Sequence, residues 1–209
     1  MNSITKAARF HPGKIPPVRP MPSGGWFVAI AFSLPVLAGA VVALLNGAAG
    51  WKKMPTEAAI LFCGLSVAGL SALAVGFYRQ FKPGEREPAD GRAALVILLA
   101  GFAAFAGVEF GWHPGGDDTL LNAWRCLRIG TSVALAAAVL LLLWARKGYA
   151  VNPASAAFWT GTLASMAGLI ALGLHCQGFE LSHQLMGHAS MIVVSCYGVA
   201  WLARRFQLK

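Results

Sequence analysis

The stretch ASAAFWTGTLASMAGLIALGL, residues 154–174, contains no Lys, Arg, Asp or Glu. A membrane-spanning α-helix needs about 20 consecutive apolar residues, so this stretch predicts a helix that crosses a bilayer. Small residues recur along it, and Ala164 and Gly168 form a small-xxx-small pair that lets a second helix approach closely. We expect this pair to pack inside one bundle, with a dimer interface as the alternative.

Five further apolar stretches flank it, at about 26–46, 58–78, 93–110, 127–145 and 184–203. The chain as a whole is 57% hydrophobic and 12% charged, against roughly 45–50% and about 25% in soluble domains. Isolated sheet edges are not tolerated in hydrocarbon, which favours helices. The sequence therefore predicts an all-α fold, a bundle of six transmembrane helices over residues 26–204.

The basic residues predict the orientation of the bundle. Six spans place both termini on one side, and the loops and ends of that side carry 13 of the 17 Lys and Arg residues. Cytoplasmic loops are enriched in Lys and Arg, so we expect both termini, including the tail 205–209, in the cytoplasm of a bacterial inner membrane. The net charge of +9 then records topology, and we expect no direct binding of nucleic acid. Residues 1–25 contain five prolines and predict an extended cytoplasmic segment that is available to a partner.

One group of residues has the chemistry of a metal or redox site. The six-span topology gathers the ends of the fourth, fifth and sixth spans on the outer face, together with Cys126, His175, Cys176, His183 and His188. The loop 110–127 adds His113 as a possible neighbour. Thiolate and imidazole are ligands for a Zn or Cu ion, so the group could bind a metal. Two thiols on an oxidising side can instead form a disulfide. The third interpretation is that these residues are ordinary polar side chains at the membrane interface.

Other features exclude whole classes of protein. No charged residue lies deep within an expected span, which argues against an ion pump or a proton-coupled transporter. The chain has no CxxC motif, which argues against a membrane thiol oxidase, and we expect no enzymatic activity. Cys63 and Cys196 lie within spans, where we expect them to pack as small apolar residues.

Several strings occur in the order found in one family: PVRPMPS (17–23), YRQFKPG (78–84), WRCLRIG (124–130), WARKG (144–148), the His175-Cys176 dipeptide, and the His183 and His188 pair. In this order the chain resembles the NrsF family of six-span inner-membrane proteins. Members of that family act as negative regulators (anti-sigma factors) of extracytoplasmic-function sigma factors.

The resemblance implies a role for two sets of residues. Cys126 and Cys176 match the outward-facing cysteines that the family uses to sense metal or oxidative stress. On the cytoplasmic side, the segment expected to bind the sigma factor is Pro17, Val18, Arg19 and Pro20. Two alternatives stay open: a metal-binding or thiol-redox membrane protein without a sigma partner, and a structural subunit of a larger membrane complex.

Overall fold

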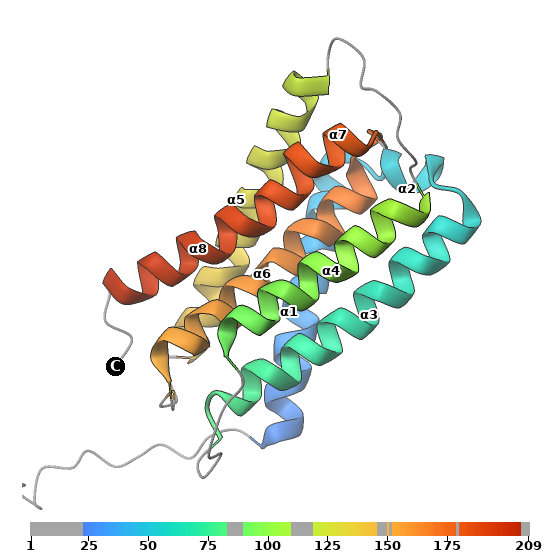
Figure 1. Ribbon diagram of the computed structural model, residues 1–209. Helices are drawn as coiled ribbons and strands as arrows, with labels where there is room; N and C mark the ends of the chain where they lie inside the picture. The colour runs from blue at the N-terminus through green and yellow to red at the C-terminus, as the bar shows by residue number, and fades with distance from the viewer. Residues whose placement is uncertain are drawn as a thin grey trace, which may run out of the picture.

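The protein is a bundle of helices. The computed structural model describes residues 23–82, 90–109, 119–145, 150, 152–178 and 180–205. Within these residues the elements, in chain order, are α1 (Gly24–Asn46), α2 (Ala49–Lys53), α3 (Thr56–Arg79), α4 (Gly91–Glu109), α5 (Thr119–Ala145), α6 (Pro153–His175), α7 (Leu181–His183), the π-helix η2 (Gln184–Ala189) and α8 (Ser190–Arg205) (Figure 1). The all-α prediction is confirmed for the described part of the chain.

Five of the helical segments are long and apolar enough to cross a membrane, namely α1, α3, α5, α6 and the segment Gln184–Ala203. Their outer surfaces are apolar as well: Leu44 is 85% exposed and Leu45 is 79% exposed. In water such a surface would be costly, whereas lipid solvates it. The structure therefore shows a multi-pass membrane protein. The helix α4 is apolar over Gly91–Ala104, a shorter stretch than the other five.

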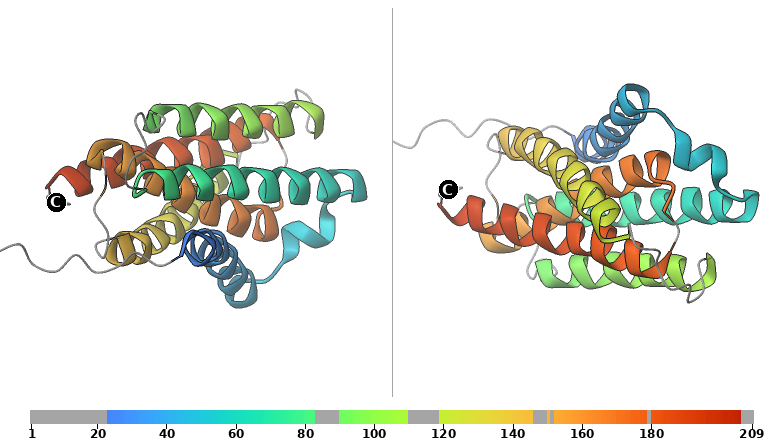
Figure 2. Two further views of the ribbon diagram at one scale, coloured as in Figure 1. Left: turned by 90° about the horizontal axis from the view of Figure 1, so that it is seen from below. Right: turned by 90° about the horizontal axis from the view of Figure 1, so that it is seen from above.

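The helix α6 forms the centre of the bundle. It contacts α1, α2, α3, α4, α5 and α8, and α5 and α4 lie on opposite sides of it (Figure 2). Small residues make this possible, because a Cβ atom added at Gly168 would lie 2.7 Å from the carbonyl oxygen of Gly130 on α5. Ala164 is fully buried. The small-residue pair predicted from the sequence thus packs inside the bundle.

Local signals set the ends of α6. Asn152 is the N-cap, and its side chain accepts a hydrogen bond of 3.1 Å from the backbone N–H of Ser155. Pro153 occupies the first turn, where its missing N–H costs nothing. The helix ends at His175, and the next residue, Cys176, has an extended backbone.

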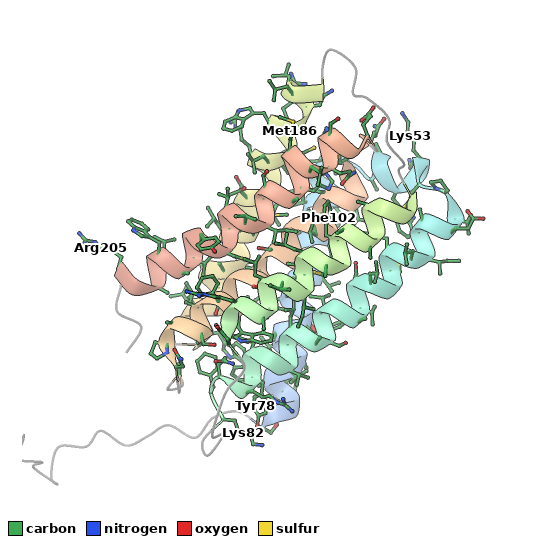
Figure 3. All side chains as sticks on the ribbon, viewed as in Figure 1. Lys53, Tyr78, Lys82, Phe102, Met186 and Arg205 are labelled. Carbon is green, nitrogen blue, oxygen red and sulfur yellow. The ribbon has the colours of Figure 1, made fainter. Side chains whose placement is uncertain are left out.

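Aromatic rings fill the end of the bundle where α1 and α6 begin and α3 and α5 finish. The Phe27 ring lies 5.3 Å from Phe77, 5.5 Å from Phe81 and 4.2 Å from Trp144, measured between centroids. Phe77 is fully buried. Figure 3 shows Tyr78 at this end of the molecule. We call these rings, together with Tyr78, the aromatic end.

Candidate metal or redox site

Four potential metal ligands meet at the end of the bundle opposite to the aromatic end. Cys126 comes from the early part of α5, Cys176 follows α6, His183 ends α7 and His188 belongs to η2. In Figure 3, Met186 of η2 and Lys53 of α2 lie at this end, far from Tyr78. All four side chains are buried, and one ligand atom from each lies within 4.8 Å of all the others. We call these four residues the Cys/His group.

The two sulfur atoms and one histidine nitrogen of the group are in direct contact. The Cys126 thiol donates a hydrogen bond to Sγ of Cys176 across 3.2 Å, and Cys176 Sγ lies 3.0 Å from Nε2 of His183. The rings of His183 and His188 meet edge to face with centroids 5.6 Å apart. Nε2 of His188 is buried without a hydrogen-bond partner among the residues that the structure describes. An unpaired buried polar atom is costly, so it marks a position where a further partner would be favourable.

The π-helix explains how two histidines that are five residues apart can share a site. In an α-helix, residues five apart point about 140° away from each other. A π-helix forms i→i+5 hydrogen bonds and has more residues in each turn, so residues five apart lie nearer to the same side of the axis. The segment η2 starts directly after His183 and contains His188, and the backbone N–H of Ser190 reaches the carbonyl of Leu185. The wide turn therefore brings both imidazoles to the same side of the helix.

Glycines allow the backbone to come close around the group. A Cβ atom at Gly178 would lie 3.0 Å from the His183 ring, and one at Gly187 would lie 3.1 Å from the carbonyl oxygen of Ala123 on α5. At Gly50 of α2 it would overlap the carbonyl of Cys176. The short helix α2, which follows the positive-φ residue Gly47, thus packs directly against the backbone of a site cysteine.

Electrostatics favour the thiolate at one of the two cysteines. The hydrogen bond from Cys126 lowers the pKa of the Cys176 thiol below its ordinary value, burial opposes this by raising it, and His183 and His188 lower it further. The thiolate is the form that binds metals and attacks disulfides or oxidants. Cys176 is therefore the more reactive sulfur of the pair.

The structure separates His175 from the other candidates. Its Nδ1 lies 3.2 Å from the carbonyl oxygen of Gly47, so the side chain faces the turn between α1 and α2 rather than the Cys/His group. The two neighbouring side chains point in different directions because His175 is the last residue of α6, whereas Cys176 has an extended backbone. His113 and the segment Pro17 to Pro20 lie outside the described residues.

The two remaining cysteines lie outside the Cys/His group. Cys196 of α8 is fully buried, and its sulfur lies 3.5 Å from Oγ1 of Thr162 and 3.6 Å from Oγ of Ser165 on α6. Cys63 of α3 is exposed on the surface of the bundle. Cys196 packs between helices, as expected from the sequence, whereas the same expectation is wrong for Cys63, whose side chain lies on the outer face of α3.

Sequence reasoning missed two neighbours of the group. Gln184 is 4% exposed, and its amide donates a hydrogen bond of 2.8 Å to the carbonyl of Gly178. Phe102 of α4 places its ring 6.5 Å from the ring of His188. Gln184 could have been suspected from the sequence because it directly follows His183. Phe102 could not, because nothing distinguishes it from the other apolar residues of its span.

Comparison with protein-family models, with curated proteins and with solved structures gave no match. The fold and the site still define a class. The protein is a multi-pass helical membrane protein with two thiols and two imidazoles buried together at one end of its bundle.

Proposed function

We propose that the protein is a membrane-embedded stress sensor that restrains an extracytoplasmic-function sigma factor, with the Cys/His group as its sensing site. The observation that carries the sensor role is the convergence of four ligand atoms within 4.8 Å in a buried position. The sigma factor as partner rests on the family resemblance of the sequence.

The group suits a Zn or Cu ion. Tetrahedral zinc with Zn–S of about 2.3 Å and Zn–N of about 2.0–2.1 Å requires about 3.8 Å between sulfurs and about 3.5 Å between sulfur and nitrogen. The contacts of 3.2 Å and 3.0 Å lie close to these separations, so small side-chain movements suffice. Nε2 of His188 has no hydrogen-bond partner among the described residues, so it is available as a ligand atom. Cys126, Cys176, His183 and His188 would hold the ion.

The same pair of sulfurs suits oxidation. A disulfide needs the two Sγ atoms about 1.2 Å closer than the 3.2 Å that separates them now. Metal binding and oxidation exclude each other, because a disulfide removes both thiolate ligands. Either signal therefore changes the contacts that hold α5 against the chain after α6.

The proposed membrane arrangement has six spans, with α4 as the sixth, in a bacterial inner membrane. Both termini lie in the cytoplasm, and the Cys/His group lies at the periplasmic end. The helices α5 and α8 run from the group to the opposite end of the bundle (Figure 1). A signal that favours one arrangement of these helices changes the cytoplasmic face, where the segment Pro17 to Pro20 binds the sigma factor.

A co-purification experiment tests this function. The full-length protein is isolated from native membranes in mild detergent, before and after exposure to zinc or to a thiol oxidant. We expect a sigma factor to be retained at rest and released by the signal in the wild type and in the matched variant Cys63→Ser. The variants Cys126→Ser and Cys176→Ser retain it under both conditions. Absence of a sigma factor from every sample would contradict the proposal.

A second candidate function keeps the Cys/His group as the functional site but has no sigma factor as partner. The same four-ligand group would then serve a metal-binding or thiol-redox membrane protein. Zinc binding by the purified protein, with no sigma factor in any co-purified sample, would favour this alternative. A structural subunit would tolerate substitution of all four residues without a change in any stress response.

A further inference from the structure

A cavity of about 330 Å³ lies between α3, α4 and α6 and reaches the Cys/His group. Its walls are almost entirely apolar, formed by side chains such as Leu65, Leu98 and Leu169. Its polar lining comes from Ser66 of α3 and, at the Cys/His group, from Cys176, Gln184 and His188. This volume falls in the range of small-molecule binding sites, and an apolar chamber with a few convergent polar groups is typical of them.

The mouth of the cavity faces the region where lipid surrounds the bundle. Ala68 and Ala72 of α3 and Ile97 of α4 line the cavity and are also exposed on the surface. These residues lie in the middle of their helices, away from the ends where water and headgroups are found. An occupant would therefore enter sideways from the hydrocarbon, which selects a lipophilic molecule.

The polar end selects the chemistry of that molecule's head. His188 lines the cavity and has a buried Nε2 without a described partner. An acyl chain would fill the apolar walls but would leave this nitrogen unpaired. A carbonyl at the head of an apolar tail would fill the walls and accept a hydrogen bond from the imidazole. Next to it stand the two thiols of Cys126 and Cys176, which together can supply two electrons.

We propose that the cavity binds an isoprenoid quinone with its head group against Cys176 and His188, and that this quinone is the oxidant of the Cys126/Cys176 pair. One S–S bond forms between the two sulfurs, and two S–H bonds are lost. The two protons and two electrons that leave the thiols convert the two quinone carbonyls into the hydroxyls of the quinol. The proposal rests on the sensor role proposed above and names the signal: the oxidation state of the membrane quinone pool.

The first test follows electrons. Metal-free full-length protein in detergent, with its thiols reduced, is mixed without oxygen with a short-tailed benzoquinone. Quinol is measured by absorbance and the disulfide by alkylation and mass spectrometry. We expect one quinol per chain and a Cys126–Cys176 bond in the wild type and in Cys63→Ser, and loss of both products in Cys176→Ser. Wild-type protein that forms no quinol would overturn the proposal.

The second test follows the route. Gly101 lines the cavity, and a Cβ atom there would meet nothing within 4 Å, so Gly101→Phe places a ring in the empty space. Gly64 of α3 is exposed, lies outside the cavity lining and is equally open, so Gly64→Phe is the matched control. We expect Gly101→Phe to lose the reaction with quinone and Gly64→Phe to keep it. Equal rates in the two variants would show that the cavity is not the route.

A small water-soluble thiol oxidant separates the two proposals. If it forms the Cys126–Cys176 bond and releases the sigma factor while the quinone does neither, the quinone proposal fails and the sensor stands. If the bond forms with either oxidant and no sigma factor is released, the regulatory function fails and the quinone site stands. Mass spectrometry of lipids that co-purify with the protein adds a further outcome: a phospholipid in place of quinone would identify an acyl chain as the occupant and overturn the quinone proposal.

Discussion

The two ends of the bundle are filled by very different side chains. At the aromatic end, Phe27, Phe77 and Trp144 pack ring against ring. At the other end, the Cys/His group buries sulfur and nitrogen atoms, and Nε2 of His188 has no described partner. Apolar rings gain from burial alone, whereas buried polar atoms are favourable only with a partner. The contrast assigns stability to the first end and binding to the second.

The largest effect that would sharpen this contrast is expected from Phe77→Ala. Removing a fully buried ring from the aromatic end leaves a cavity, and such changes cost about 3–5 kcal/mol of unfolding free energy in well-packed cores. We expect a lower midpoint of thermal unfolding in detergent with unchanged zinc affinity. A loss of zinc affinity in the folded variant would show that the two ends are coupled.

Cys176→Ser should produce the complementary result. Changes outside the ligand shell alone weaken metal sites about 10–100-fold. Loss of a thiolate ligand should therefore weaken zinc binding by about 100-fold, equivalent to about 2.8 kcal/mol. Competition with a chromogenic chelator measures the affinity. Thermal unfolding of the metal-free variant should match the wild type, and zinc should raise the midpoint in the wild type only. A zinc-induced shift that survives the substitution would remove Cys176 from the ligand set.

A smaller effect is expected at the start of α6, which lies at the aromatic end. Asn152→Ala removes the side-chain oxygen that accepts from the N–H of Ser155. Loss of an N-cap costs about 1 kcal/mol. The thermal midpoint should fall by less than in Phe77→Ala, and Asn152→Asp, which keeps an acceptor, should restore it. A fall in Asn152→Asp equal to that in Asn152→Ala would contradict the capping role.

His175→Ala should have the smallest effect on the site. The imidazole contacts Gly47 and not the Cys/His group, so we expect zinc affinity to stay within about 2-fold of the wild type. His183→Ala, which removes an imidazole 3.0 Å from Cys176, is the matched comparison and should weaken binding clearly. Equal losses in the two variants would place His175 in the site after all.

The sequence predicts those site residues whose position follows from the order and direction of the spans. Cys126 begins one span, Cys176 ends the next and His183 begins the last, so alternation of direction brings all three to the same end. Each expected span lies on a helix, and five of the six helices are long and apolar enough to cross a membrane. The helix α5 begins at Thr119, well before the predicted start at 127, because Asn122 and Arg125 interrupt the apolar pattern of its first turns. Apolar length predicts where a helix crosses hydrocarbon and says little about how far it continues beyond.

Side-chain direction is the part that the sequence could not supply. His175 and Cys176 are neighbours in the chain, yet the end of α6 between them sends one to Gly47 and the other to the group. His188 reaches the group only because η2 replaces an α-helical turn. The cavity depends on which apolar faces of α3, α4 and α6 leave space between them. The sequence could not predict it, because apolar residues that line a cavity and apolar residues that pack tightly look the same in the sequence.

The π-helix also gives the last span a way to rotate about its own axis. The chain runs without a break from His183 through η2 and α8 to Arg205. Successive residues of an α-helix are rotated by about 100° about its axis, so tightening the wide turn by one residue would turn everything beyond it by about that angle. From His188 to Arg205 the helix extends about 26 Å. A change of ligand at one end of the bundle would thus reach the other end as a rotation of the whole helix, with no loop in between to absorb it.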